Sequence, residues 1–160
     1  MGKKSAGLTL EVAIPGLAET EALGKRIAAV LTAGDVVTLE GDLGAGKTTL
    51  ARAILRGLGV EETVPSPTFT LVQEYETARG AIFHYDLYRI ENTSELDELA
   101  LDDAMAEGIV LIEWPERLAE TPNDALRACL DVRGNGERRA KLSGPARWAE
   151  LFAGCADAAG

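Results

Sequence analysis

Hydrophobic positions in the first third of the chain predict two strand and helix pairs. Apolar and polar residues alternate over residues 8–14, which indicates a strand. Apolar residues recur at helical spacing over residues 17–31, and a continuous apolar run follows at residues 36–39. Helical spacing returns at residues 50–58. We therefore expect the order strand, helix, strand, helix, with the second strand short and buried.

The middle of the chain predicts a hairpin, acidic helices and a central strand. Residues 64–68 carry two prolines and cannot be helical, so they form an extended loop. Residues 69–76 and 81–85 have strand patterns joined by a short turn, which predicts a hairpin. Residues 96–105 indicate one or two short acidic helices. The apolar run at residues 109–112 is typical of a strand buried on both faces.

The last part of the chain predicts a second hairpin and a final helix. Residues 125–132 and 137–142 flank the turn sequence at 134–136, and Pro145 opens a short helix. The combination of β-α-β units with two hairpins predicts a mixed sheet, parallel at its centre and antiparallel at its margins. At 160 residues the length predicts one α/β domain spanning residues 1–160.

The sequence GDLGAGKT at residues 41–48 satisfies the phosphate-binding pattern G-x-x-x-x-G-K-[ST] in full. It lies between the predicted buried strand and the helix after it, which is the context this pattern requires. Its glycines let backbone N–H groups surround phosphate, Lys47 can reach the terminal phosphates, and the Thr48 hydroxyl can coordinate Mg²⁺. The pattern predicts a nucleoside triphosphate site in a three-layer P-loop NTPase fold. The predicted nucleotide-binding residues here are Asp42, Leu43, Gly44, Ala45, Gly46, Lys47, Thr48 and Thr49.

Two carboxylates are candidates to hold Mg²⁺, because P-loop folds place such a group at a strand end near the loop. Glu113 directly follows the most apolar strand, and Asp86 follows residues 81–85 in the same way. With 26 acidic residues in the chain, either could instead be an exposed carboxylate. We interpret His84 as a partly buried strand side chain rather than a catalytic group. The predicted catalytic residues are Lys47, Asp86 and Glu113, and the predicted metal ligands are Thr48, Glu113 and Asp86.

Composition restricts the partners and the compartment. The formal net charge of −10 argues against tight unaided binding to a nucleic-acid backbone, so contact with RNA is expected through a protein partner. Cys129 and Cys155 are the only cysteines and lack paired metal spacing, which predicts reduced thiols. No apolar stretch approaches membrane-spanning length, so we expect a cytoplasmic protein without membrane contact.

Four motifs follow one another along the chain: GDLGAGKTT at 41–49, SPTFTL at 66–71, HYDLYR at 84–89 and IEWPE at 112–116. In order and spacing they resemble the bacterial tRNA threonylcarbamoyladenosine biosynthesis ATPases, the TsaE (YjeE) family. The first motif is shared by many ATPases, but the combination of all four motifs is specific to this family. The resemblance covers nearly the whole chain and implies a parallel sheet core flanked by antiparallel strands.

The resemblance implies a P-loop ATPase that uses ATP and Mg²⁺, hydrolyses ATP slowly and acts beside the TsaB–TsaD pair. That pair transfers a threonylcarbamoyl group to an adenosine next to the anticodon of tRNAs that read codons beginning with A. The chain itself is then not the transferase; it sustains turnover of the partner complex. By the same resemblance, residues 42–48 form the ATP loop, Thr48 and Glu113 hold Mg²⁺, and Asp86 lies near the γ-phosphate.

Further contacts implied by the resemblance lie outside these motifs. A glycine and arginine contact to nucleotide late in the chain corresponds to Arg138, with Arg139 in reserve. The adenine pocket falls near the first helix, beginning at Leu17. The loop at residues 66–70 belongs to the second motif, and its roles are inferred from its residues. Proline makes it rigid, and it either senses the γ-phosphate or a partner, or serves only as a structural connector.

Two other nucleotide-dependent classes remain as alternatives. A small-molecule or nucleotide kinase on the same fold needs an arginine-rich lid over the phosphates, yet only Arg79 and Arg89 lie between Thr63 and Leu111. A GTP-dependent switch is disfavoured because the chain contains no N-K-x-D guanine signature. The accessory ATPase is therefore the preferred hypothesis and the kinase its alternative.

Overall fold

The computed structural model describes residues 7–42, 44–61, 71–92, 94–97, 99–118 and 120–153. Within these ranges the strands are β1 (Leu8–Ala13), β2 (Val36–Glu40), β3 (Val72–Thr77), β4 (Gly80–Asp86), β5 (Ile109–Glu113), β6 (Leu126–Val132) and β7 (Arg138–Gly144). The α-helices are α1 (Leu17–Val30), α2 (Lys47–Gly57), α3 (Ser94–Asp97) and α4 (Leu101–Glu107). The 3₁₀ turns η1 (Pro115–Arg117) and η2 (Ala146–Trp148) follow β5 and β7, and residues 149–153 continue η2 as a helix.

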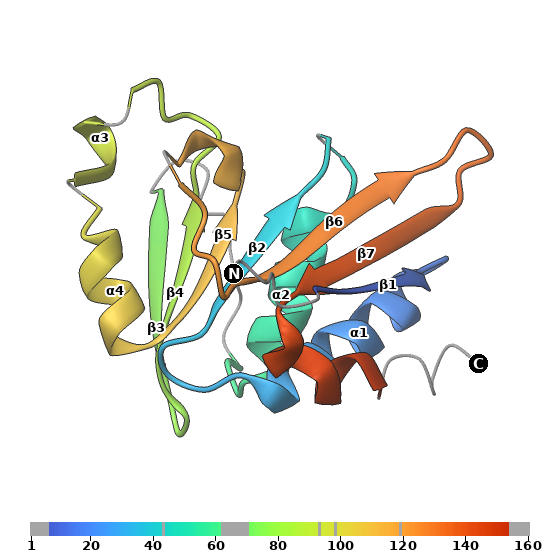
Figure 1. The fold of residues 1–160 in the computed structure, drawn as a ribbon, viewed down its shortest axis with the longest axis horizontal. Coiled ribbons are helices and arrows are strands. Elements are labelled where there is room, and N and C mark those ends of the chain that lie inside the picture. The colour runs from blue at the N-terminus through green and yellow to red at the C-terminus, as the bar shows by residue number, and fades with distance from the viewer. Residues whose placement is uncertain are drawn as a thin grey trace, which may run out of the picture.

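The strands form one seven-stranded sheet in the order β1-β7-β6-β2-β5-β4-β3 (Figure 1). Pairing is parallel from β6 through β2 and β5 to β4, whereas β1–β7, β7–β6 and β4–β3 are antiparallel pairs. Every residue of β5 is buried, while every second residue of β1 is exposed. A continuous apolar run suits a strand covered on both faces, and an alternating one suits a margin. The predicted mixed sheet is therefore confirmed.

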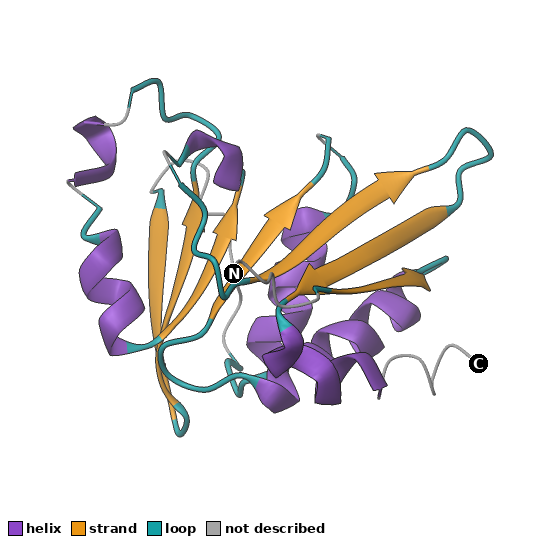
Figure 2. Cartoon of the chain, in the orientation of Figure 1, coloured by secondary structure: helices purple, strands orange, loops and turns teal. Residues whose placement is uncertain are grey.

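Helices cover both faces of the sheet and complete three layers (Figure 2). Helices α1 and α2 share one buried cluster with the sheet, whereas α4 packs into a second cluster. Ile109 and Leu111 belong to the first cluster, and Val110 and Ile112 belong to the second. Successive side chains of a strand point to opposite faces, so the two clusters lie on opposite sides of β5.

Helices α1 and α2 approach closely because glycine meets alanine at two points of their contact. A Cβ atom on Gly24 would lie 2.3 Å from the Cβ of Ala53, and one on Gly57 would lie 2.7 Å from the Cβ of Ala28. Carbon atoms in contact prefer separations of about 3.5–4.0 Å. A larger side chain at either glycine would push α2 away from α1. Since α2 begins directly after the loop that follows β2, such a shift would move that loop as well.

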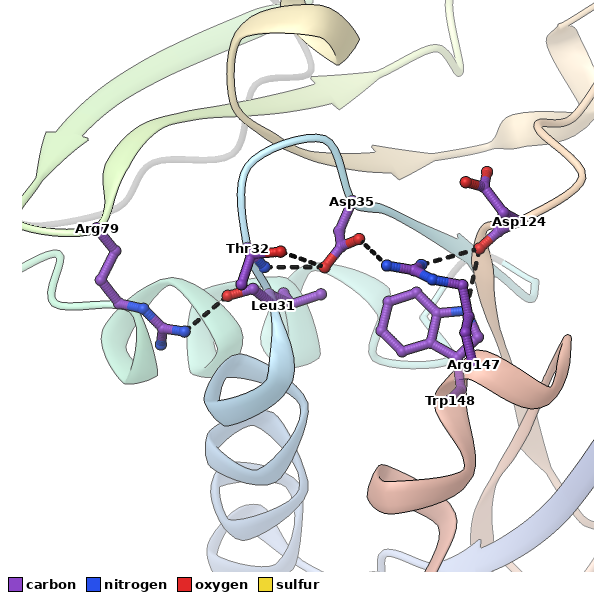
Figure 3. A network of polar contacts seen from close by, with 7 residues as sticks. All are labelled: Leu31, Thr32, Asp35, Arg79, Asp124, Arg147 and Trp148. Carbon is purple, nitrogen blue, oxygen red and sulfur yellow. Dashed lines mark hydrogen bonds and ion pairs between the residues drawn. The ribbon is translucent and has the colours of Figure 1, made fainter.

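A buried carboxylate, Asp35, joins the turn after α1 to the C-terminal segment (Figure 3). Its Oδ2 accepts a hydrogen bond from the backbone N–H of Thr32 at 2.8 Å, and its Oδ1 pairs with the guanidinium of Arg147. The guanidinium carbon of Arg147 lies 4.4 Å from the centre of the Trp148 ring. The indole N–H of Trp148 donates to the backbone oxygen of Asp124 at 3.0 Å. These contacts fix η2 beside the first residue of β2.

We expect Asp35→Ala to lower the free energy of unfolding by about 1–3 kcal/mol, because Thr32 and Arg147 both lose their acceptor. Asp124→Ala is the matched control, since only the backbone oxygen of Asp124 takes part in these contacts. The control should change the free energy of unfolding by less than about 0.5 kcal/mol. Urea unfolding measures both values. Equal losses in the two variants would contradict a structural role for the Asp35 carboxylate.

Arg79, in the turn between β3 and β4, caps the C-terminus of α1 (Figure 3). Its two terminal nitrogens donate to the backbone oxygens of Ala28 at 2.8 Å and Leu31 at 2.6 Å. Helix α1 has no basic residue in its own last turn. Arg79 therefore supplies the positive charge that the C-terminal carbonyl groups favour, and it holds the β3–β4 hairpin against α1.

Most predicted elements occur within a few residues of where the pattern placed them, and one difference in bounds has a clear cause. The strand expected over residues 69–76 begins at Val72, because Leu71 has a φ of 69° and directs its carbonyl to the N–H of Asp86 at 3.0 Å. The extended loop predicted at residues 64–68 lies outside the described residues. In the described part of the chain, every helix is too short or too polar to cross a membrane.

Candidate functional site

The parallel strands β2, β4 and β5 end at one edge of the sheet, beside the loop that leads into α2. Ligands of open α/β sheets bind at such an edge, outside the C-terminal ends of the strands. A cavity of about 410 Å³ opens there. It is lined by Gly44, Gly46, Lys47, Thr48, Thr49, Asp86, Tyr88, Glu113, Trp114 and Arg138.

The loop between β2 and α2 depends on glycine at three positions. Gly41, Gly44 and Gly46 have φ values of 141°, 83° and 107°, in the left-handed region that other residues rarely adopt. A Cβ on Gly41 would also lie 2.6 Å from the backbone oxygen of Leu130. Gly46, the N-cap residue of α2, has no side chain to cap the helix, and the first turn of α2 carries no acidic residue. The loop therefore leads into a helix end whose positive dipole is not neutralised by its own turn.

Lys47 begins α2, and its ammonium is held within the loop. Its Nζ donates to the backbone oxygens of Gly41 and, at 2.9 Å, Asp42. It also lies 4.2 Å from the centre of the Trp114 ring, a cation–π geometry. Burial lowers the pKa of Lys47, against the opposing effect of nearby Glu113 and other carboxylates. The loop thus presents a largely desolvated cation beside the cavity.

Thr48 and Glu113 are in direct contact, as the predicted metal site requires. The Thr48 hydroxyl donates to Oε1 of Glu113 at 2.9 Å. The contact joins the first turn of α2 to the last residue of β5, the strand beside β2. Glu113 is 2 % exposed, so it is not the exposed strand-end carboxylate that was the alternative.

His84 is a residue whose role sequence reasoning missed. It was predicted to be partly buried, but it is fully buried, and its Nε2 lies 2.7 Å from Oε2 of Glu113. In the parallel pairing of β4 with β5, His84 lies opposite Leu111 and Asp86 lies opposite Glu113. The spacing of two residues between His84 and Asp86 places both on one face of β4. That spacing is the signal that could have related His84 to this edge of the sheet.

Asp86 ends β4 and lies beside Glu113 in the sheet. Its Oδ1 accepts a hydrogen bond from the backbone N–H of Tyr88 at 3.0 Å, and the side chain is 4 % exposed. The backbone N–H of Asp86 bonds to the carbonyl of Leu71. Asp86 therefore lies in the cavity wall on a backbone fixed from both sides, at the strand end where the sequence placed it.

The side chains around Thr48 fit Mg²⁺ in combination with a phosphate ligand. Within the described residues, no group of three or more His, Cys, Asp or Glu side chains could hold a metal ion. Mg²⁺ is usually held by one or two carboxylates, with phosphate oxygens and water completing the octahedron. The hydroxyl of Thr48 and the carboxylates of Glu113 and Asp86 are hard oxygen donors of that kind, and all three line the cavity.

Tyr88 and Trp114 form an aromatic pair in the cavity wall that sequence reasoning did not single out. Their ring centres are 4.8 Å apart. Trp114 has φ 63° and ψ 51°, and its N–H donates to the backbone oxygen of Leu39 at 3.3 Å. This unusual backbone follows Glu113 directly, where the chain leaves β5. The indole lies against Lys47, so the pair lines the cavity next to the loop.

The two candidate arginines differ in their surroundings. Arg138, the first choice, lines the cavity at the start of β7. Arg139 instead pairs with Glu11 at 3.5 Å and with Glu137 at 3.4 Å. Leu17 is 61 % exposed and does not line this cavity. The structure therefore brings Arg138 to the site and does not bring Leu17 there.

The other residues of the loop between β2 and α2 line two different hollows. Gly44, Gly46 and Thr49 line the cavity with Lys47. Asp42 and Ala45, with Gly44, line a second hollow of about 320 Å³ beside the end of β6. Leu43 lies outside the described residues.

The fold and the site define a mixed α/β protein in which a glycine-rich loop ending in lysine and threonine connects a central parallel strand to a helix. The amino-acid sequence identifies the family within this class of protein. The model of the family described as "Threonylcarbamoyl adenosine biosynthesis protein TsaE" matches residues 14–140. The chain belongs to the TsaE family.

Curated relatives and a solved structure support this assignment. The chain is 43 % identical over 122 residues to the tRNA threonylcarbamoyladenosine biosynthesis protein TsaE of Bacillus subtilis, covering 75 % of this chain and 76 % of the relative. It is 42 % identical over 126 residues to the protein of that name from Nostoc, covering 76 % and 77 %. The crystal structure of Bacillus subtilis YdiB matches with a TM-score of 0.80 at 30 % identity, covering 96 % of this chain and 98 % of that one.

Proposed function

We propose that the cavity binds ATP with Mg²⁺, and that the protein hydrolyses ATP slowly as an accessory factor in the threonylcarbamoyladenosine modification of tRNA. One observation carries the proposal: Lys47, Thr48 and Glu113 line a single cavity beside a helix N-terminus whose N-cap residue is glycine. The relatives' description as tRNA threonylcarbamoyladenosine biosynthesis proteins supports the modification as the process.

Phosphate binding would use the start of α2 and the Lys47 ammonium. To reach a phosphate, Lys47 exchanges the carbonyl oxygens of Gly41 and Asp42 for phosphate oxygens. The exchange replaces neutral acceptors by charged ones, and hydrogen bonds to charged acceptors are shorter and stronger. Arg138 would add a second cation from β7, across the sheet edge from the loop.

Thr48 and Glu113 would hold Mg²⁺. When bound, the ion would supply positive charge against the phosphate oxygens. The Thr48 hydroxyl offers its oxygen lone pairs, and Glu113 offers the carboxylate oxygen that lies beside it. Asp86, the neighbour of Glu113 in the sheet, would orient the attacking water through its carboxylate.

The partners we propose are the TsaB–TsaD pair, which carries out the threonylcarbamoyl transfer to tRNAs that read codons beginning with A. Family membership supports this choice. The net charge of −10 supports docking on proteins rather than direct gripping of tRNA, because phosphate backbones need cationic surfaces. Nucleotide in the cavity would act on docking through the segments that surround it, among them Asp86 to Tyr88.

We expect the affinity for the TsaB–TsaD pair to differ between the ATP and ADP states by about 5- to 150-fold, the usual range of coupling between two sites. Pull-downs followed by titration with ATP, ADP or no nucleotide measure it, and ATP turnover is recorded alone and with the pair plus tRNA. Turnover should rise in the full mixture. An affinity for the pair that is the same with ATP, with ADP and without nucleotide would contradict the proposal. Tight binding of tRNA without the pair would contradict it as well. Phosphorylation of a small acceptor would favour a kinase instead.

A further inference from the structure

The buried His84 beside Glu113 has no part in the function proposed above. It is fully buried in β4, and its Nε2 lies 2.7 Å from Oε2 of Glu113. Its second ring nitrogen, Nδ1, has no hydrogen-bond partner among the described residues. We assign the tautomer with the proton on Nε2, because the oxygens of a carboxylate accept hydrogen bonds. The contact with Glu113 is therefore the polar interaction that His84 contributes here.

Packing alone does not account for histidine at this position. The residues near it in the sheet, Ile82, Leu111 and Tyr85, are buried, and an apolar side chain would fill the space without leaving a ring nitrogen unsatisfied. An unpaired buried polar atom destabilises the folded protein, because it loses its hydrogen bonds to water without replacement. The bond to Glu113 is what offsets that cost.

The two oxygens of Glu113 have separate partners. Oε1 accepts from the Thr48 hydroxyl at 2.9 Å, and Oε2 accepts from His84 at 2.7 Å. Together the two bonds fix the rotation of the carboxylate plane about its terminal torsion, which is otherwise broad. Without the donor on Oε2, a carboxylate that is 2 % exposed would keep an unsatisfied oxygen and would turn to find another partner.

We propose that His84 is a positioning residue for the metal end of the cavity: its Nε2–H holds Oε2 of Glu113, so that Oε1 stays beside the Thr48 hydroxyl. The proposal rests on the Mg²⁺–nucleotide site proposed above. Partners behind a metal ligand orient it, and their loss typically weakens metal affinity by about 10- to 100-fold. His84 does not touch the nucleotide in this scheme and acts through Glu113 alone.

Two variants of nearly equal size distinguish the effect of the hydrogen-bond donor of His84 from the effect of its side-chain packing. His84→Gln retains an N–H at about the reach of Nε2, whereas His84→Met has a similar length and no donor. His84→Asn is a further comparison, because its amide is too short to reach Oε2 of Glu113. Calorimetry measures the affinity for ADP with and without Mg²⁺, and the ratio of the two affinities is the Mg²⁺ enhancement. Thermal unfolding of each variant verifies that it is folded.

We expect His84→Met and His84→Asn to lower the Mg²⁺ enhancement by about ten-fold or more, and His84→Gln to retain most of it. Affinity for ADP without Mg²⁺ should stay unchanged in all three, since the loop and Lys47 are untouched. An undiminished enhancement in folded His84→Met or His84→Asn overturns the positioning role, as does an equal loss in His84→Gln. A wild-type protein that binds ADP without any Mg²⁺ enhancement, or fails to bind it, overturns the proposed function and this role with it.

Discussion

Lys47→Ala should raise the Kd for ATP about 100-fold or more, because a hydrogen bond to a charged group contributes about 1.5–3 kcal/mol and Lys47 can donate more than one to phosphate. The loop itself should survive the change. The left-handed glycines at 41, 44 and 46 set its path, and the lysine ammonium bonds to the backbone oxygens of Gly41 and Asp42 and lies over the Trp114 ring. Calorimetry with Mg²⁺ and ATP measures the effect on binding, and urea unfolding separates it from a loss of stability.

Lys141→Ala is the matched control for this result. It removes one positive charge of the same kind from an exposed position in β7 that does not line the cavity. Its Kd for ATP should match that of the wild type. If Lys47→Ala also bound ATP with wild-type affinity, the loop would not be a phosphate site, whatever its sequence pattern.

The parts of the fold that the sequence predicted best are those in which one segment determines its own environment. The continuous apolar run at residues 109–112 predicted a strand buried on both faces, and β5 is that strand. The glycine pattern at residues 41–48 predicted a loop between strand and helix, and the backbone of Gly41 and Gly46 shows why glycine is required. These properties are local, so a single sequence contains the information.

The features that the sequence did not predict depend on contacts between distant segments. The bond between His84 and Glu113 requires the parallel register of β4 against β5, and no local pattern specifies that register. The observed strand β3 does not include Leu71, because the carbonyl of Leu71 accepts a hydrogen bond from the N–H of Asp86, fifteen positions further along the chain. Arg79 entered the sequence analysis only as one of two arginines too few to form a kinase lid, and the structure shows that it caps α1. Tertiary contacts decided each of these positions.

The candidate site was predicted in part from local pattern and depends in part on contacts between distant segments. Glu113 and Asp86 were each predicted at a strand end, from the apolar run before them, and they are neighbours in the sheet. Arg138 was assigned by resemblance, and the start of β7 brings it to the cavity because β7 runs antiparallel to β6. Leu17 was assigned in the same way and lies exposed, away from the cavity lining. Motif spacing thus located the edge of the sheet at which the cavity opens better than it located the contacts far from that edge.

Asp86→Asn should lower the rate of ATP turnover about 100-fold, within the range of about 10²- to 10⁴-fold that a positioned acid or base contributes, while the Kd for ATP changes little. The asparagine oxygen still accepts the hydrogen bond that the N–H of Tyr88 gives to Asp86. The backbone bond to Leu71 is likewise retained, so the turn after β4 keeps its shape. What the substitution removes is the negative charge.

The Asp86→Asn variant distinguishes two roles that the geometry allows for Asp86. The carboxylate either orients the attacking water or binds the Mg²⁺–nucleotide complex. A carboxylate that orients the attacking water acts on the transition state, so its removal lowers kcat while ground-state binding persists. A carboxylate needed only to bind the Mg²⁺–nucleotide complex would raise the Kd as strongly as it lowered turnover. Asp86→Ala, which also loses the acceptor for Tyr88, should add a loss of stability that Asp86→Asn does not show. Single-turnover measurements with the TsaB–TsaD pair and tRNA, set beside calorimetry, decide between the two, and equal losses in Asp86→Asn would assign Asp86 to binding.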